Sequence, residues 1–445
     1  MIEQYFKEAK KVILDAKAGK IKPSLEFLDM TNESPLRISS RIGFTMGRYM
    51  IIFGPSGTGK TALADTEMVL NPILKQFITE PKQRTNIEVI YRSMERPPVD
   101  KMIKWIAYLL YWKYRMIIDV PTLMQLPNRR RELNSEDLER IDSLSPYIEY
   151  ISECVTLLGG ARTPAELYDY NLQQIYKNGA YFKTDMDHIY CNSVKIASFP
   201  VNDKPGQVHT KSAAKFDFGI DKKGNIFVSI KKEGKEEVFL TQQSQKFLPR
   251  DDKKILVVLN DTINKIQGDD ALKTLNAHSR YMGELRDAGA ISGIDISQVS
   301  KEDVKKIDSS LHMTQGHVKG TGDIANNADT IISIVDPLHY EISTWNTGPG
   351  GIYEYDASRC QGTLRVCQIV KNSHGLGIHK FPFIMLGENG YFYELPSTGM
   401  KEEDYRNIEE NILKVRTYTV EQSSLNLGIE KINIPNRTFN SKEPF

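Results

Sequence analysis

The sequence lacks the features of an exported or disulfide-stabilised protein. Its cysteines are few, and they show neither C-x-x-C spacing nor paired histidines, so zinc is not expected. A disulfide framework is not expected in a chain of 445 residues, which suggests a reducing cytosol. The first 20 residues carry charges throughout and lack the apolar core of a signal peptide. The cysteines are Cys154, Cys191, Cys360 and Cys367.

Long apolar runs, internal repeats and a charge excess are also missing. The most apolar helical candidate, Trp105 to Ile118, is interrupted by Lys113 and Arg115, so we expect no membrane contact. Basic and acidic residues number 58 and 57, and the resulting net charge of +1 leaves any nucleic-acid contact to local patches. The composition is that of an ordinary globular protein long enough for one large α/β domain with additions.

The most informative segment is an apolar, β-prone run that leads into a glycine-rich loop. Gly54 to Thr61 has the pattern G-x-x-x-x-G-K-T, and a helical segment follows it. In this context backbone N–H groups and the helix N-terminus surround a phosphate. Lys60 is predicted to reach the β- and γ-phosphates, and the Thr61 hydroxyl to bind Mg²⁺. The residues expected to hold ATP are Gly54, Pro55, Ser56, Gly57, Thr58, Gly59, Lys60, Thr61 and Ala62.

Hydrolysis of a bound nucleotide also requires a carboxylate that holds Mg²⁺ through water. Asp261 ends the continuous apolar run Lys254–Asp261, which is typical of a strand buried in a parallel sheet. We therefore predict that Asp261 holds the metal. The alternative is an ordinary residue of a turn, because the pair Asn260-Asp261 is turn-prone.

The attacking water needs a base that orients it and accepts its proton. Glu95 comes just after the short apolar strand Ile87–Tyr91, which we expect to lie next to the P-loop strand. These observations make Glu95 the candidate base. The alternative is a capping-type glutamate in the first turn of the helix that Pro97 and Pro98 begin.

The pattern of the chain predicts a mainly parallel α/β core interrupted by an inserted antiparallel β subdomain. The insertion is predicted from alternating apolar residues at 194–199, 215–220 and 225–230. In chain order the expected units are a helix and linker at 1–40, the first part of the core at 41–180, the insertion at 181–250, the second part of the core at 251–396 and a C-terminal tail at 397–445.

The order of these motifs resembles that of DnaB-like replicative helicases, whose ATPase domain has the RecA fold and forms hexameric rings. GPSGTGKTALA resembles the nucleotide loop, IYRSMERP the strand before the catalytic glutamate, and ILVVLNDTINKI the Walker B strand. ISGIDISQVSKED resembles the segment with the polar sensor, which implies that role for Gln298. GTGDIANNADTIISI resembles the DNA-facing loop, and LRVCQIVKNSHGLG the late strand that ends in Lys371. The resemblance spans about residues 41–395, apart from the insertion.

The sequence departs from the family pattern at several points. Where the family has its arginine finger, this chain has Ser373. Lys371 could serve as the cation donated to a neighbouring subunit, and Arg359 and Arg365 are the other candidates, unless the finger is absent. Only a helix and a linker precede the core, as in phage or plasmid members, which implies the cytoplasm of a host if a phage encodes the chain. The insertion has no counterpart that matches it.

In a ring, the loops after Asp261 and before Thr330 would face the central channel and contact DNA. Glycine there lets backbone N–H groups approach phosphates, and lysine supplies positive charge. The alternative is a set of solvated surface lysines. Basic and aromatic residues do not interleave as they would in a stacking platform for bases. The candidates for DNA contact are Lys273, Lys305, Lys306, Lys319, Gly320 and Thr321.

The resemblance implies an ATP-dependent helicase that moves on single-stranded DNA as a homo-hexamer in DNA replication. ATP and Mg²⁺ are the expected cofactors, and a primase or helicase loader is a further expected partner. The alternatives are a RecA-like recombinase or annealing ATPase that forms open filaments, and an assembly ATPase that uses nucleotide as a switch without unwinding DNA. The implied catalytic residues are Lys60, Glu95, Gln298 and Lys371.

Overall fold

The computed structural model describes most of the chain between residues 43 and 413. The predicted N-terminal helix lies almost wholly outside the described residues, as do Lys305, Lys306, Lys319, Gly320 and Thr321. The described residues are 10, 14, 24–26, 43–79, 87–199, 214–220, 226–230, 236–299, 311–318, 322–347, 351–373, 379–396 and 398–413.

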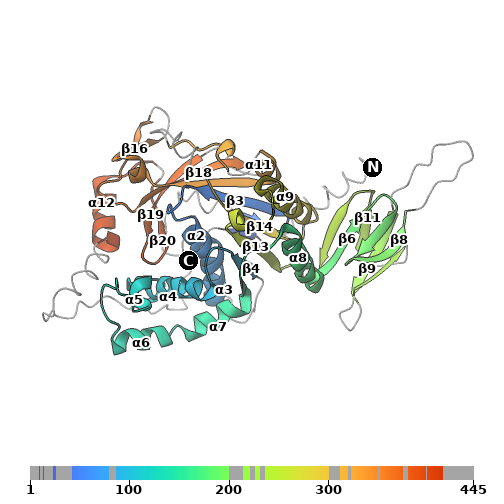
Figure 1. Ribbon diagram of the computed structural model, residues 1–445, viewed down its shortest axis with the longest axis horizontal. Helices are drawn as coiled ribbons and strands as arrows, with labels where there is room; N and C mark the ends of the chain where they lie inside the picture. The colour runs from blue at the N-terminus through green and yellow to red at the C-terminus, as the bar shows by residue number, and fades with distance from the viewer. Residues whose placement is uncertain are drawn as a thin grey trace, which may run out of the picture.

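A mixed sheet forms the centre of the molecule (Figure 1), and in the described part of the chain it has nine strands in the order β20–β19–β18–β15–β3–β14–β13–β4–β5. The six strands from β15 to β5 run parallel to one another. Every residue of β13 is buried, as its continuous apolar sequence predicts for a parallel sheet. These strands are β3 (Arg48–Gly54), β4 (Ile87–Ser93), β5 (Val155–Gly159), β13 (Ile255–Asp261), β14 (Ser292–Gln298) and β15 (Thr330–Val335).

The other edge of the sheet is antiparallel. β18 (Leu364–Asn372) pairs with β15, and β19 (His379–Leu386) and β20 (Tyr391–Glu394) follow outward. Shorter antiparallel pairs are β1 (Ser24–Glu26) with β2 (Gly43–Thr45) and β16 (Thr344–Thr347) with β17 (Tyr353–Asp356). The predicted mainly parallel core is confirmed, with this antiparallel edge as an addition that the sequence pattern does not reveal.

One predicted neighbour relation in the sheet is wrong. We expected the strand before Glu95 to lie next to the P-loop strand, but β4 pairs with β13 and β5. β14 and β13 both lie between β4 and the P-loop strand β3. The reason is that the order of strands in a parallel sheet is set by the crossover connections, which the order of motifs along the chain does not specify.

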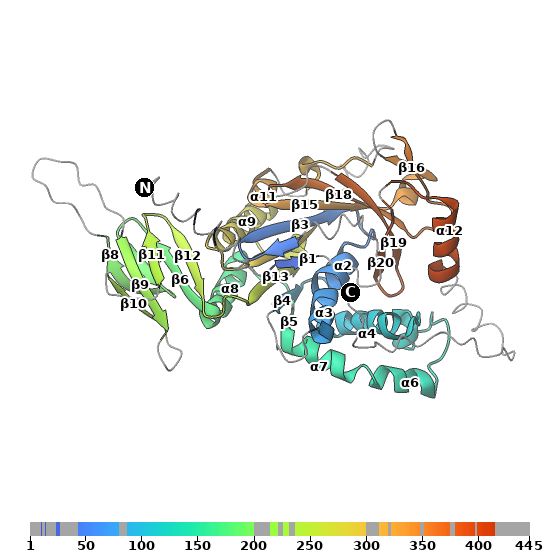
Figure 2. The ribbon, with the colours of Figure 1, turned by 180° about the vertical axis from the view of Figure 1, so that it is seen from behind.

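Helices cover both faces of the sheet (Figures 1 and 2). After β3 the helical chain runs without a break through α2 (Lys60–Leu63), the π-helical segment η2 (Ala64–Leu70) and α3 (Asn71–Thr79). α3 packs on α7, whereas α8 and α11 both pack on α9, which contacts β3 and β14 on the opposite face. The other helices are α4 (Pro98–Tyr114), α5 (Val120–Leu123), α6 (Ser135–Asp142), α7 (Ser145–Cys154), α8 (Pro164–Asn178), α9 (Ala271–Asp287), α11 (Gly322–Asn327), α12 (Glu402–Ile408) with η7 (Glu409–Leu413), and the short turns η3 (Ile263–Lys265), η4 (Gln315–His317) and η5 (Pro337–Tyr340).

Local signals placed two of these helices correctly. α4 begins at Pro98, whose missing N–H costs nothing in a first turn. α8 begins after Thr163, whose side chain accepts from the backbone N–H of Glu166 while the Glu166 carboxylate accepts from that of Thr163. In the part of the chain that the structure describes, no helix is long and apolar enough to cross a membrane.

The predicted insertion forms two small antiparallel sheets that stand to one side of the core (Figure 2). The pairing of Ile226 with Ile220 confirms the predicted hairpin. Buried apolar side chains, among them Phe182, Ile189 and Phe216, give the insertion a core separate from that of the main sheet. One sheet has β12 (Gln245–Pro249), β6 (Gly179–Thr184), β7 (His188–Cys191) and β8 (Val194–Ser198), and the other has β10 (Ile226–Ile230), β9 (Ala214–Ile220) and β11 (Glu236–Leu240).

Candidate nucleotide site

The loop between β3 and α2 has the geometry that its glycines predict. Gly59 is the N-cap of α2 with φ 100°, and a Cβ atom there would come within 2.1 Å of the Met385 sulfur. At Gly54 a Cβ atom would lie 2.2 Å from the backbone oxygen of Ile334. No other residue fits at either position without displacing its neighbour. The loop therefore approaches its surroundings closely, with its helix N-terminus at the carboxyl edge of the parallel sheet.

Lys60 lies inside this loop. Its Nζ donates to the backbone oxygen of Pro55 at 2.5 Å, and the Thr58 hydroxyl donates to the same oxygen at 3.0 Å. Burial lowers the pKa of Lys60 to about 8, against the opposing effect of the Asp261 and Glu95 carboxylates. A phosphate group at the loop would restore a full positive charge to this lysine.

The structure brings Thr61 and Asp261 into direct contact. The Thr61 hydroxyl donates to Oδ1 of Asp261 at 2.9 Å, which joins positions 200 residues apart in the chain. A hydroxyl beside a carboxylate, next to the glycine-rich loop, is a set of oxygen ligands that fits Mg²⁺. The described ranges contain no group of three or more histidine, cysteine or acidic residues that could hold a metal ion. Mg²⁺ held by one or two protein ligands and substrate phosphates does not need such a group.

Glu95 reaches the same edge although two strands separate β4 from β3. The backbone N–H of Met94 donates to the backbone oxygen of Asp261 at 2.7 Å, which carries the chain past the end of β13. Glu95 itself is exposed and close enough to Lys60 for its charge to act on that ammonium. The position suits a base that must meet solvent. The alternative of a capping-type glutamate in the first turn of α4 is wrong, because Glu95 precedes the N-cap Pro97 and α4 begins at Pro98.

Gln298 is the last residue of β14 and lies opposite Gly54 in the sheet register. Its backbone N–H donates to Oδ1 of Asn264 at 2.8 Å, and the following Val299 N–H donates to the backbone oxygen of Gly54. The half-buried Gln298 thus lies where the P-loop begins, and its sensor role stays a prediction.

A buried charged cluster beneath this site was not predicted from the sequence. Lys101 on α4 has no exposed side-chain surface, and its Nζ lies 3.1 Å from Asp65 and 2.9 Å from Asp261. The Tyr91 hydroxyl lies among them. One signal was available, since Lys101 shares a helix side with the apolar Trp105, as i and i+4 spacing implies.

The candidate finger residues differ sharply in their surroundings. Lys371 lies beside Ile331, which pairs with Ile51 in the middle of β3. Its Nζ donates to the backbone oxygens of Ala325 and Asn326 at 3.0 and 3.1 Å. It therefore caps the end of α11, with its pKa lowered mainly by burial.

The two arginines are held within this chain. Arg365 is buried, donates from Nε to the backbone oxygen of Thr58 at 3.2 Å and pairs with Asp336, so it supports its own P-loop. Arg359 pairs with Glu402 and with a second acidic residue near the C-terminal helix, where its guanidinium also covers the ring of Tyr405. Both guanidinium groups thus have carboxylate partners within this chain.

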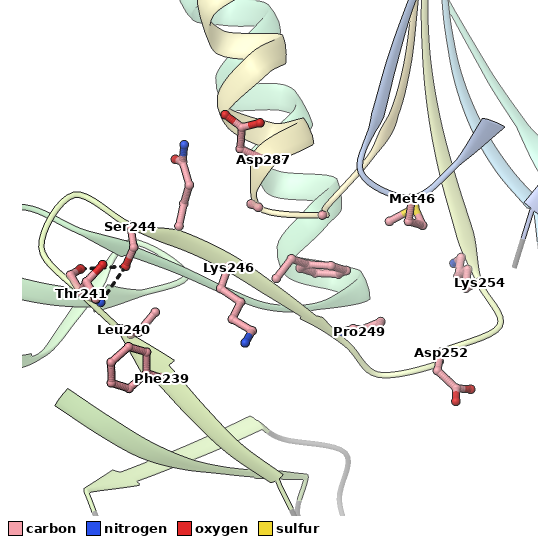
Figure 3. A pocket seen from close by; sticks show the side chains of 14 residues that line it. Met46, Phe239, Leu240, Thr241, Ser244, Lys246, Pro249, Asp252, Lys254 and Asp287 are labelled. Carbon is pink, nitrogen blue, oxygen red and sulfur yellow. Dashed lines mark hydrogen bonds between the residues drawn. The ribbon is translucent and has the colours of Figure 1, made fainter. Parts of the chain in front are cut away.

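Of the predicted DNA contacts, the structure describes Lys273. It is exposed near the start of α9, with its Nζ 3.8 Å from Asp270. A separate pocket of about 570 Å³ lies between the insertion and the core (Figure 3). Met46, Lys254 and Gly289 line it just before β3, β13 and β14 begin, so the pocket lies at the amino edge of the sheet, away from the P-loop.

No protein-family profile matches the chain, and a comparison with curated proteins finds no match. Many solved structures are similar to the chain, among them the following two. One is described as a DnaB-like replicative helicase and its interactions with primase, with a TM-score of 0.47, 14% identity, and coverage of 79% of this chain and 58% of that chain. The other is described as an ATPase domain, with a TM-score of 0.48, 13% identity, and coverage of 79% of this chain and 86% of that chain.

The chain thus spans less than two thirds of the first of these proteins. What this chain's own strands and loop establish is the fold class: a mainly parallel sheet, covered by helices on both faces, with a glycine-rich loop at the carboxyl edge. The chain has an α/β architecture with a glycine-rich loop, and in the order of its motifs it resembles the DnaB-like replicative helicases.

Proposed function

We propose that the protein is an ATP-dependent, Mg²⁺-requiring helicase that moves on single-stranded DNA as a homo-hexameric ring in replication. The observation that carries the nucleotide part is the contact between Thr61 and Asp261 at the mouth of a glycine-rich loop. The helicase part rests on the order of the sequence motifs from the P-loop to Lys371.

Each residue then has a definite task. The loop N–H groups and Lys60 bind the phosphates, and Thr61 with Asp261 would hold Mg²⁺. Bound Mg²⁺ would offset the negative charge of the phosphates. Glu95 orients the attacking water and accepts its proton, and exposure of this carboxylate lets water reach it. Gln298, beside Gly54, detects whether the terminal phosphate is present.

We assign the cation from the neighbouring subunit to Lys371, because Lys371 contacts only backbone oxygens in the described part of its own chain, whereas Arg359 and Arg365 are each paired with a carboxylate. Lys371 would have to leave the end of α11 to act, which makes its contribution conditional on assembly. Lys371→Ala should then lose about 10³-fold in DNA-stimulated hydrolysis while it still binds ATP. In mixtures, Lys371→Ala and Lys60→Ala subunits should partly complement each other, because each supplies the half-site that the other lacks.

For DNA contact we propose Lys273, Lys305, Lys306, Lys319, Gly320 and Thr321, and for further partners a primase or a helicase loader. The chain's units are proposed with the boundaries 1–40, 41–180, 181–250, 251–396 and 397–445. Removal of 1–20 tests the first unit, since a helix that packs on a neighbouring subunit should be needed for the ring and not for the fold.

The decisive experiment measures ATP hydrolysis and unwinding of a forked duplex in the same samples, with Glu95→Gln as the matched inactive control. We expect hydrolysis that single-stranded DNA stimulates, together with unwinding. Stimulated hydrolysis without unwinding, on open filaments seen by electron microscopy, would favour the recombinase or annealing ATPase. If DNA leaves the hydrolysis rate unchanged and assembly depends on nucleotide, the assembly ATPase that uses nucleotide as a switch would be favoured.

A further inference from the structure

The two carboxylate oxygens of Asp261 have separate partners. Oδ1 accepts from the Thr61 hydroxyl at 2.9 Å and faces the P-loop. Oδ2 points the other way, where it accepts from Lys101 Nζ at 2.9 Å and from the Tyr91 hydroxyl at 3.1 Å. A carboxylate held at one oxygen cannot rotate freely, so its other oxygen stays where a metal at Thr61 would meet it.

The group that holds Oδ2 is enclosed. The Lys101 side chain is fully buried, and Asp65 and Asp261 each expose only 5% of theirs. Lys101 Nζ contacts both Asp65 oxygens, at 3.3 and 3.1 Å, and the Tyr91 oxygen at 2.8 Å. The Tyr91 hydroxyl also reaches Asp65 at 2.6 Å. Every donor of the ammonium thus has a partner within the cluster, which fixes its position.

We propose that Lys101 is a positioning residue of the metal site: it holds Oδ2 of Asp261 so that Oδ1 faces Thr61 and Mg²⁺. The inference rests on the proposed function, since it assigns Lys101 to the same nucleotide site. Outer partners of this kind orient a metal ligand without touching the metal. Lys101 is on α4, which begins just after Glu95, so the same helix start ties the candidate base to the metal ligand.

A simpler role for Lys101 would be to offset the charge of two buried carboxylates, because an unpaired buried charge is costly. The two roles separate in a double variant. Lys101→Met alone leaves two carboxylates without a cation, whereas Asp65→Asn with Lys101→Met returns the cluster to the net formal charge of the wild type. The double variant still lacks the hydrogen bond to Oδ2 of Asp261. If charge alone matters, the double variant behaves as wild type.

The experiment measures Mn²⁺ binding in the presence of ADP by electron paramagnetic resonance, and ADP binding in EDTA by calorimetry. We expect Lys101→Met and the double variant each to weaken Mn²⁺ binding by roughly 10- to 100-fold, the range seen when an outer partner is lost. ADP binding in EDTA should change less than about 2-fold, because the loop and Lys60 still hold the phosphates. Tyr91→Phe, which removes only one donor to Oδ2, should give a smaller loss in the same direction.

Thermal unfolding identifies variants that do not fold, and if Lys101→Met is one of them, the charge-matched double variant carries the test. A double variant that binds Mn²⁺ as tightly as the wild type would overturn the positioning role. Equal losses of Mn²⁺ binding and of metal-free ADP binding would overturn it too, because general damage moves both. Failure of the wild type to bind ADP at all would instead refute the proposed nucleotide site.

Discussion

The carboxyl edge of the main sheet and the inserted β subdomain bury side chains of very different chemistry. At the sheet edge, charged side chains are enclosed: Lys101 is paired with Asp65 and Asp261, and Lys60 donates to a backbone oxygen inside its loop. The insertion instead buries aliphatic and aromatic side chains such as Phe182 and Phe216 between two small sheets. Enclosing charge is costly unless it is fully paired. The contrast therefore separates a region organised for chemistry from one organised by packing.

The largest effect should follow removal of the cation at the loop. Lys60→Ala deletes the ammonium that Gly54 to Thr61 presents to the phosphates, so hydrolysis should be abolished and nucleotide binding strongly weakened. Fluorescent nucleotide titration and phosphate release would measure both, with Lys177→Ala, an exposed lysine on α8, as the control. Turnover of Lys60→Ala at the wild-type rate would contradict the assignment of nucleotide chemistry to the carboxyl edge of the sheet.

Glu95→Gln should come next. The change is isosteric and lies on an exposed residue, so the fold and ATP binding should be kept while turnover falls by a factor on the order of 10² or more. Single-turnover hydrolysis with bound ATP separates chemistry from binding. Normal hydrolysis would mean that Glu95 is only a residue before α4 and that the base is elsewhere.

The enclosure of Lys60 predicts a pH dependence of nucleotide binding. Its pKa in the free protein is about 8, and bound phosphate raises it. Below pH 8 the lysine is already charged, so nucleotide binding adds no proton to it. Above pH 8 binding must take up a proton, so affinity should fall by up to about tenfold per pH unit. Calorimetry in buffers of different ionisation enthalpy at pH 7 and pH 9 would measure the number of protons taken up on binding. Equal proton uptake at the two pH values would contradict a lowered pKa of Lys60.

The smallest effect on activity should come from the insertion. Phe216→Ala removes a buried ring from its core, which typically costs about 3–5 kcal/mol, while DNA-independent hydrolysis should stay within about 2-fold of the wild type. Val194→Ala, at an exposed position on β8, is the control and should leave stability nearly unchanged. Loss of hydrolysis in Phe216→Ala, measured where the main sheet is still folded, would show that the two regions are coupled.

The parts of the site that could be predicted are those that depend on short patterns of neighbouring residues. The P-loop, Asp261 at the end of its strand and the start of α4 all follow from residues close together in sequence. Strand order did not follow, and β4 lies two strands further from β3 than expected. Lys101 and Asp65 were missed because their pairing depends on how α4 and η2 meet in space. The ion pair of Arg365 with Asp336 is likewise invisible in the sequence.

Asp261→Asn tests the central claim most directly, because this side chain joins the P-loop to the buried cluster and is the proposed ligand of Mg²⁺. The measurement is ATP hydrolysis as a function of Mg²⁺ concentration, alongside ATP binding in EDTA. The account predicts that the variant binds ATP in EDTA as the wild type does, yet hydrolyses it at least about 10²-fold more slowly at saturating Mg²⁺. Hydrolysis at the wild-type rate, with the same Mg²⁺ dependence, would contradict the assignment of this edge as the nucleotide site.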